Sequence, residues 1–301
     1  MFKFLLLLAI SLHFFSTAFG QNSNDFPTPG AHDTMLRFVE FNNKQLLRSD
    51  EAMTLLAGDA AKWNTDWFGQ VFSKPDKIIS IKKDYSVART QMVDKNSRVV
   101  DMYFYLTFED GWKIRSMRAM AQTGFLDVIN TSLKSKPLLT TEEKETLANT
   151  ELVLSSDKML TQWFQKSRLE LDKLTALAVL ETKPKPVKTL KAPPKTKNGV
   201  SYAVGVSQME KNDTEDDEPQ TISYISAYRP AFPKTANSLK KLNLSVLEIK
   251  SNGNIEITIG GITDNSVGFV YSPSGSPPLI DGWRYIWVER IAPKWYLFRT
   301  T

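Results

Sequence analysis

An alternation of apolar and polar side chains beginning near residue 100 is the clearest pattern along the chain. The apolar positions are Val100, Met102, Phe104, Leu106 and Phe108. The positions between them are Asp101, Tyr103, Tyr105, Thr107 and Glu109. A period of two is typical of a β-strand with one buried face. We therefore expect the first set to lie in a core and the second set to form a solvated sheet face.

A second strand is predicted to start at Trp112, after a break at Asp110-Gly111. A two-residue loop would place the large apolar groups of the two strands on opposite faces. A loop of Glu109, Asp110 and Gly111 would pair Phe108 with Trp112, Leu106 with Ile114 and Tyr105 with Arg115. Burial should select this second register, because a slip of one residue exchanges the faces. Gly111 would then take the left-handed position of the turn.

Apolar residues at helical spacing predict helices on both sides of this hairpin. Asp33 or Thr34 is expected to cap a first helix, within a helical region at 33–70. Thr140 and Glu143 form a capping box. Ser155 or Ser156 is expected to cap a further helix. The apolar stripe of that helix comprises Leu160, Trp163, Phe164, Leu171, Leu174 and Ala178.

Short apolar runs separated by Gly, Pro and Asn predict further strands. They are expected at 76–82 and 85–93, and then at 201–208, 221–228, 244–250, 254–259, 266–271, 284–291 and 295–300. A loop of Ala292, Pro293 and Lys294 would pair Ile291 with Trp295 and Glu289 with Leu297. Both faces of this last hairpin are largely apolar, so we expect it to be central to its sheet.

These elements predict an α+β protein with a helix-plus-antiparallel-sheet N-terminal domain, a helical connector and a β-rich C-terminal domain. We expect a signal peptide at 1–20, a disordered leader at 21–32, an α+β domain with a helical extension at 33–181, a linker at 182–199 and an antiparallel β-rich domain at 200–301. The linker is rich in Lys and Pro and contains no acidic residue before Asn198, which favours a solvated, extended chain.

The first residues indicate secretion. Lys3 precedes an apolar stretch, and Ala18-Phe19-Gly20 resembles a cleavage signal, so cleavage is predicted before Gln21. An N-terminal membrane anchor is the alternative, but the apolar stretch is short for a membrane span. The chain contains no cysteine, which fits a bacterial periplasm better than an extracellular space where disulfides are common.

The central hairpin resembles the nuclear transport factor 2-like superfamily, also called the cystatin-like α+β roll. The resemblance rests on Tyr103–Phe108, Asp110-Gly111, Trp112 and Ile114, after helices at 33–70, and covers residues 33–121 at most. It implies a cone-shaped roll whose mouth holds a ligand in some members, while many members only bind partners. Enzymes of the family use a buried Asp or His with a Tyr, and no such position can be matched residue by residue in this chain.

Little catalytic chemistry is available. The chain has two histidines, and His13 would leave with the signal peptide. One histidine, His32, would then remain, which argues against a Cys–His pair, a multi-histidine metal site and a Ser-His-Asp triad. The remaining candidates are Asp101 as a general base, with Tyr103 or Tyr105 as a donor. The alternative is a solvated sheet face with no catalytic role, and we predict no cofactor and no metal site.

The resulting hypothesis is a secreted or periplasmic, non-enzymatic binding protein for an unknown protein or small-molecule ligand. The alternative is a small-molecule enzyme, an isomerase or hydrolase, that uses Asp101 and a tyrosine in a roll-like pocket. The net charge of +5 over 301 residues is mild, so no nucleic-acid partner is expected. No transmembrane segment is expected after signal cleavage, and the Lys/Pro-rich linker is a candidate for weak contact with the envelope.

Overall fold

A computed structural model describes residues 29–63, 70–93, 99–119, 123–182, 221–228, 231–262, 265–278 and 285–300. The predicted signal peptide, most of the predicted leader and linker, and the strand predicted at 201–208 lie outside these residues. Among the described helices, none combines the length and the apolar character that a membrane span requires.

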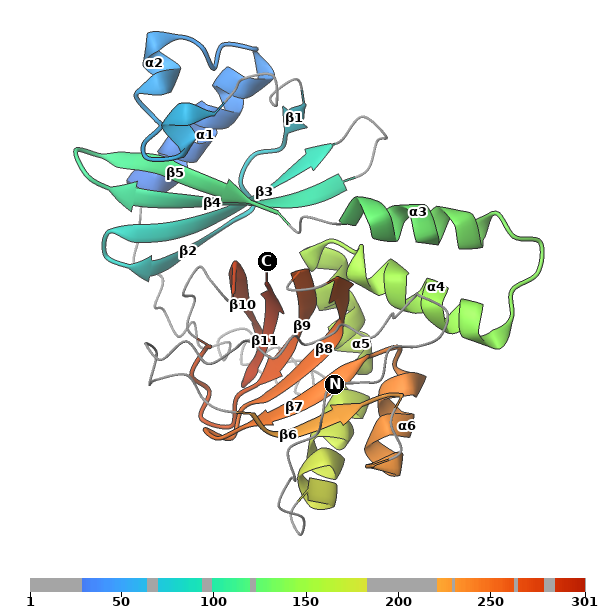
Figure 1. Cartoon of the computed structure of the whole chain (residues 1–301). Coiled ribbons are helices and arrows are strands. Elements are labelled where there is room, and N and C mark those ends of the chain that lie inside the picture. The colour runs from blue at the N-terminus through green and yellow to red at the C-terminus, as the bar shows by residue number, and fades with distance from the viewer. Residues whose placement is uncertain are drawn as a thin grey trace, which may run out of the picture.

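The first unit is a sheet with two helices on its outer face (Figure 1). The helices are α1 (Pro29–Asn43) and α2 (Asp50–Met53), followed by the 3₁₀ turn η1 (Ala60–Lys62). The strands are β1 (Val71–Phe72), β2 (Lys77–Lys82), β3 (Tyr85–Val93), β4 (Val99–Phe108) and β5 (Trp112–Arg118). The five-stranded sheet has the order β1-β3-β4-β5, and β2 also pairs with β3.

Apolar side chains of α1 hold this helix on the sheet. Met35 and Phe38 are fully buried, and the rings of Phe38 and Phe104 lie 5.2 Å apart. The helix starts at Pro29, before the predicted caps. Thr34 does not cap it, because its hydroxyl donates to the carbonyl of Gly30 at 2.9 Å within the helix.

The central hairpin has the predicted loop and most of the predicted register. Phe108 pairs with Trp112 and Leu106 with Ile114, and Gly111 has a φ of 122°. A bulge between Tyr105 and Leu106 places Ser116 opposite Tyr105. The predicted pairing of Tyr105 with Arg115 is therefore wrong.

Three helices and a second sheet follow. The helices are α3 (Thr123–Lys134), α4 (Thr141–Val153) and α5 (Asp157–Thr182). The second sheet contains β6 (Thr221–Ser226), β7 (Val246–Lys250), β8 (Ile255–Ile262), β9 (Asn265–Tyr271), β10 (Trp287–Ala292) and β11 (Trp295–Arg299), with α6 (Pro233–Lys241) between β6 and β7. The six-stranded sheet has the order β10-β11-β9-β8-β7-β6. Neither α3 nor α6 was predicted from the sequence.

Helix α5 belongs to the core of the second sheet. Its buried side chains include Leu160, Phe164 and Leu171, which share a cluster with Ile257, Phe269 and Trp295. The rings of Phe164 and Trp295 lie 5.3 Å apart. The sequence grouped this helix with the N-terminal unit as an extension at 33–181. In the structure its apolar stripe contacts the second sheet.

Both caps predicted for these helices exist. The capping box of Thr140 and Glu143 is complete at the start of α4. At the start of α5, the hydroxyl of Ser156 accepts a hydrogen bond from the backbone N–H of Met159 at 3.4 Å. These local signals therefore predict the starts of α4 and α5, because the partners are three residues apart.

The C-terminal hairpin pairs Glu289 with Leu297 as predicted, but Ala292 and not Ile291 lies opposite Trp295. The loop is thus one residue shorter than expected, and a bulge between Arg290 and Ala292 absorbs the difference. Lys294 takes a φ of 66° in this turn. Strand β11 lies inside the sheet between β10 and β9, whereas β10 is the outer strand.

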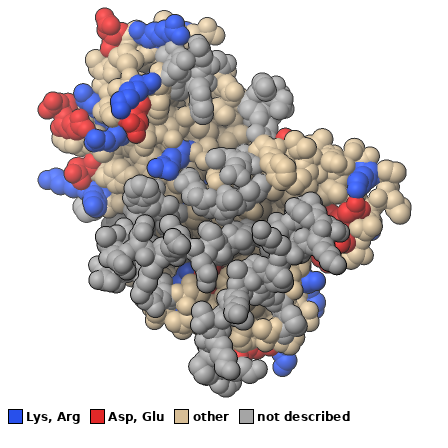
Figure 2. Space-filling model, in the orientation of Figure 1, with Lys and Arg blue, Asp and Glu red and all other residues tan. Residues whose placement is uncertain are grey.

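The outer surface of the first unit carries charges of both signs side by side (Figure 2). Exposed pairs include Arg37 with Glu51 at 2.9 Å and Lys44 with Glu40 at 2.6 Å. Exposed pairs of this kind contribute little to stability. The charged groups that join the two sheets are buried between them.

Candidate functional site

The face of β4 that was expected to be solvated is buried. Asp101 is 7% exposed, Tyr103 is 0% exposed and Tyr105 is 3% exposed. This face points toward the second sheet and the first turn of α5 (Figure 1). The prediction of a solvated face is therefore wrong, because a second unit covers the side of the sheet opposite α1.

Asp157, the first residue of α5, lies at the centre of this contact and is 1% exposed. Its Oδ1 accepts a hydrogen bond from Nε of Arg299 at 2.7 Å. Its Oδ2 accepts from Nη1 of Arg89 at 3.0 Å and from the hydroxyl of Tyr103 at 2.8 Å. One carboxylate therefore joins β3 and β4 of the first sheet to β11 of the second.

Asp101 contacts the backbone at the start of the same helix. Its Oδ2 accepts the backbone N–H of Asp157 at 2.8 Å, and its Oδ1 accepts from the side-chain amide of Gln91 at 3.1 Å. The first N–H groups of a helix lack intrahelical partners and carry a partial positive charge. A carboxylate from the first sheet thus supplies a missing acceptor to a helix of the second unit.

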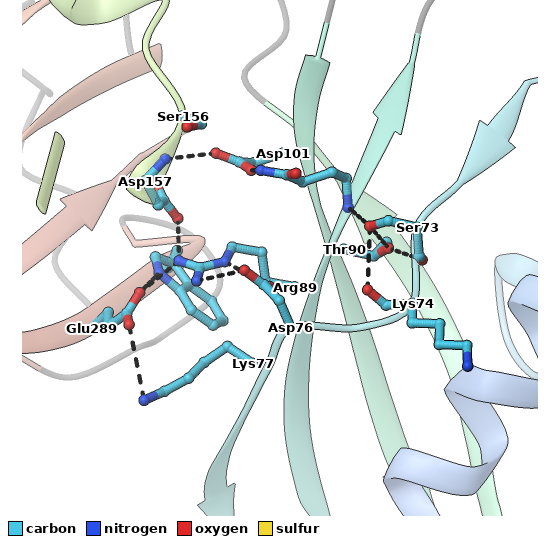
Figure 3. A network of polar contacts seen from close by, with 12 residues as sticks. Ser73, Lys74, Asp76, Lys77, Arg89, Thr90, Asp101, Ser156, Asp157 and Glu289 are labelled. Carbon is cyan, nitrogen blue, oxygen red and sulfur yellow. Dashed lines mark hydrogen bonds and ion pairs between the residues drawn. The ribbon is translucent and has the colours of Figure 1, made fainter. Parts of the chain in front are cut away.

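Arg89 on β3 contacts two further carboxylates besides Asp157, those of Asp76 and Glu289 (Figure 3). Its Nε and Nη2 donate to the two oxygens of Asp76, each at 3.0 Å. Its Nη1 also donates to Glu289 on β10 at 2.6 Å. The planar, forked guanidinium suits such multiple contacts, which a lysine could not reproduce.

Arg299 on β11 completes the cluster from the second unit. Besides Asp157, it donates from Nη2 to the carbonyl of Ser155 at 2.8 Å. The same Nη2 lies 3.8 Å from Oδ2 of Asp101. Arg299 therefore places positive charge between the two aspartates.

The pKa values of the two aspartates shift in opposite directions. Burial raises the pKa of Asp101, and the neighbouring charge of Asp157 raises it further, against the opposing effect of Arg299. Burial also acts to raise the pKa of Asp157, but Arg299, Arg89 and the Tyr103 hydroxyl outweigh it and lower that pKa. Asp157 is thus held as a carboxylate, whereas Asp101 is ionised at a cost.

An apolar contact adjoins the charges. Trp287 on β10 is fully buried and clusters with Val87, Tyr103, Tyr105 and Ile286. Its ring lies 5.1 Å from that of Tyr103, and the guanidinium of Arg89 lies 5.2 Å from its centroid. The hydroxyl of Tyr105 donates to the carbonyl of Ile286 at 2.9 Å. The contact therefore combines ion pairs with a packed aromatic centre.

The predicted site residues Asp101, Tyr103 and Tyr105 thus lie on one face. Their polar atoms contact neighbouring protein groups, most of them in the second unit. Both oxygens of Asp101 accept hydrogen bonds, and the hydroxyls of Tyr103 and Tyr105 both donate to protein oxygens. Arg115, predicted to share their face, instead pairs with Glu109 at 3.3 Å near the hairpin loop. The arrangement resembles a structural joint more than a general acid–base site, whose groups must reach a substrate.

Sequence reasoning missed the groups that complete the cluster: Arg89, Asp157, Glu289, Arg299 and Trp287. A signal existed at Arg89 and Arg299, since each is a charged residue within an otherwise largely apolar strand. Such residues are rarely buried without a partner. The identity of the partner depends on tertiary contacts, because Arg89 and Glu289 are 200 positions apart.

Within the described ranges, no group of His, Asp and Glu side chains is arranged to hold a metal ion. The carboxylates of the cluster are directed at arginines, which already supply the positive charge that a cation would provide. No family model, curated protein or solved structure matches the chain. The geometry of the cluster is therefore what bears on function.

Proposed function

We propose that the chain is a secreted or periplasmic, non-enzymatic binding or interaction protein built from two sheet units joined by a buried charge cluster. The observation that carries this proposal is the engagement of Asp101, Tyr103 and Tyr105 at that joint. Each polar atom that would act in catalysis already has a protein partner within 3.1 Å.

The enzyme alternative needs Asp101 to leave its present partners. A general base must come within hydrogen-bond reach of the proton that it removes. Movement of Asp101 toward a substrate would leave the N–H of Asp157 without its acceptor in a buried position, which costs free energy. The raised pKa of Asp101 suits a base, but the same shift follows from burial at a structural contact.

The first unit supports the proposed nuclear transport factor 2-like relationship. Helix α1 precedes four strands, β2 to β5, in which each strand pairs antiparallel with the next. The helix packs on one face of this sheet, as the roll requires. The opposite face of this sheet is covered here by the second unit. Binding through other surfaces is therefore the form of the proposal that fits this chain.

The proposal can be tested with the wild-type protein and Asp101→Asn. Each is immobilised and exposed to an envelope and secreted fraction, and captured molecules are identified by mass spectrometry. Each is also incubated with a small-molecule extract, and conversion is followed by mass spectrometry. We expect both proteins to retain the same molecules and neither to convert any compound.

Conversion by the wild-type protein that disappears in Asp101→Asn, while the circular dichroism spectra agree, would instead establish the enzyme. The same fractions also test the weaker proposal of envelope contact through the Lys/Pro-rich linker. If the linker makes this contact, the wild-type chain should retain acidic lipid or glycan from these fractions. A chain in which the lysines of 182–198 are replaced by glutamine should not retain them.

A further inference from the structure

Helix α3 has a second apolar face beyond the one that packs on its neighbour. Leu126, Asn130 and Leu133 are buried on the inner face, where α3 contacts α4. Phe125 and Val128 are 62% and 66% exposed on the outer face. A helix that buries one stripe normally presents polar residues on the other side. The exposed Phe125 next to the exposed Val128 is therefore a candidate surface for binding another molecule.

A hollow of about 370 Å³ lies beside this outer face, between α3 and α4. Its lining consists of Val128, Ile129, Ser132, Leu133, Lys136, Glu142, Glu143 and Thr146. Three of these residues, Val128, Ile129 and Leu133, are aliphatic, and the others are polar or charged. The volume accommodates a phenyl ring and lies at the lower end of the range of about 300–1,000 Å³ for small-molecule pockets.

The exposed ring and the hollow lie on one helix face. Phe125, Val128, Ile129 and Ser132 follow one another at helical spacing, so they form a single stripe. Phe125 is at one end of this stripe, and Ser132, which lines the hollow, is seven residues and about 10 Å away along the axis. A surface that carries both a projection and a matching hollow can pair with itself.

We propose that this face binds a second copy of the chain, with the two α3 helices antiparallel about a two-fold axis that passes between Val128 and Ile129. The axis lies midway between residues 125 and 132, so it brings Phe125 of each copy to the level of Ser132 of the other. Each Phe125 ring then fills the hollow of the partner. This is an isologous contact, in which residue i meets residue j in both directions.

The charges of the face favour this occupant over an anionic one. No residue of the stripe is charged. Around the hollow, Lys136 and Glu143 form an ion pair of 2.5 Å, and Glu142 adds one negative charge. A nucleic acid or an anionic lipid surface would require an excess of positive charge. An apolar patch without an excess of positive charge instead resembles the centre of a protein–protein interface.

The position of α3 makes the contact accessible. Helices α3 and α4 form a hairpin that projects to one side of the two sheets (Figure 1). The surface over α3 is drawn mostly without charged side chains (Figure 2). Two such hairpins brought together would form a four-helix arrangement, in which each outer stripe becomes an inner one.

The test is sedimentation velocity of the purified full protein and its variants across the micromolar range. We expect the wild-type protein to dimerise, and Phe125→Ser to weaken dimerisation at least tenfold, since each copy loses the aromatic anchor that fills its partner's hollow. Leu169→Ser is the matched control. Leu169 is 66% exposed on α5, so its replacement should leave the dissociation constant unchanged.

A second variant tests the fit of ring and hollow. Ser132→Trp should block the hollow and also give monomers. A mixture of Phe125→Ser with Ser132→Trp should form a mixed dimer, because one chain offers an open hollow and the other an intact phenylalanine. A wild-type protein that stays monomeric throughout, or a Phe125→Ser variant that dimerises as well as Leu169→Ser, would overturn the proposal. So would a mixture that stays monomeric although each variant is folded by circular dichroism.

Discussion

Asp101 and Asp157 are both buried, and the carboxylate of Asp101 accepts the backbone N–H of Asp157, yet the surroundings of the two carboxylates give them different roles. Asp157 receives two guanidinium groups and a phenol. Asp101 receives two neutral N–H groups, and its charged neighbour of opposite sign lies farther away, at 3.8 Å. A buried charge is tolerated where it is paired. The charge of Asp157 is therefore needed, whereas Asp101 is needed mainly as an acceptor.

Asp157→Asn should lower the free energy of unfolding by about 3–5 kcal/mol, because Arg89 and Arg299 would lose the charge that they share. Asp101→Asn should change it by less than about 1 kcal/mol. An asparagine can still accept the backbone N–H of Asp157, and its amide can face a rotated Gln91. The measurement is urea unfolding of both variants at neutral pH. Equal losses in the two variants would refute this division of roles.

The opposite pKa shifts predict opposite pH dependences. The lowered pKa of Asp157 means that its contribution is complete above about pH 3.9 and is lost as the pH falls through the folded value. The raised pKa of Asp101 means that its contribution is complete below about pH 3.9 and is lost as the pH rises through the folded value.

Unfolding of the wild-type protein and both variants across a pH series tests this expectation. On acidification from neutral pH, the wild-type protein should gain stability relative to Asp101→Asn. The difference between the wild-type protein and Asp157→Asn should stay constant until about pH 4 and shrink below it. A pH-independent difference between wild-type protein and Asp101→Asn would show that Asp101 does not titrate as described.

At the scale of elements, α4 is held on the second sheet at a glycine. Gly260 lies on β8 next to a bulge, and the side-chain amide of Asn149 donates to the carbonyls of Ile259 and Asn243 at 2.7 and 2.8 Å. A Cβ at residue 260 would lie 2.8 Å from Oδ1 of Asn149 and 2.9 Å from Cγ2 of Val153. The absence of a side chain therefore permits the close approach of helix and strand.

Gly260→Ala should lower the midpoint of thermal unfolding, at a cost of about 1–3 kcal/mol, because the packed helix must move away. Gly124→Ala on α3 is the control, since a Cβ there would have no atom within 4 Å. It should be neutral or raise stability by up to about 1 kcal/mol. A melting curve of Gly260→Ala that superimposes on that of the control would contradict this account of the α4 contact.

Elements could be predicted where the signal is local. The alternation at 100–109 and the short apolar runs at 76–93 and after residue 244 predicted strands within a few residues of their positions, because side chains two apart share a face. Helices α3 and α6 were missed. Helix α6 has only 9 residues, whereas the spacing of Leu126, Ile129 and Leu133 was an available signal for α3. The bulges at Tyr105 and Arg290 were missed because the facing strand and its packing determine them.

The candidate site was only half predictable. The alternation correctly separated Asp101, Tyr103 and Tyr105 from the first core, but it could not show that a second unit covers their face. That unit contributes Asp157, Glu289 and Arg299 from positions far along the chain. Periodicity reports which side a residue faces, and the partner on that side depends on the packing of whole units.

At the scale of the whole molecule, two sheets with separate cores meet at one mixed contact. The core of the first unit and that of the second share no residue, and Trp287 belongs to the smaller cluster between them. Its indole N–H lies 3.3 Å from Glu289, so it also orients a member of the charge cluster. Coupling between the units therefore depends strongly on this one side chain.

Trp287→Ala should remove about 3–5 kcal/mol of packing at the contact. Each unit keeps its own core, so we expect the thermal transition to separate into two, one for each unit. Differential scanning calorimetry measures the number of transitions, and Trp163→Ala, within the second unit, serves as a control that lowers one transition without separating the units. A single cooperative transition in Trp287→Ala would mean that other contacts couple the two sheets.

The distance along the chain from Arg89 to its partner Glu289 has a consequence for biosynthesis. A ribosome produces β3 and β4 long before β10 and β11, and Arg89 precedes Glu289 by 200 residues. Asp157 follows Arg89 by 68 residues, but until the end of that interval the nascent first sheet displays Arg89 and Tyr103 with neither Trp287 nor Glu289 beside them. Such an uncompleted face is a site where folding intermediates aggregate or engage chaperones. Emergence of the last two strands is thus the event that ends the vulnerable period of the first sheet.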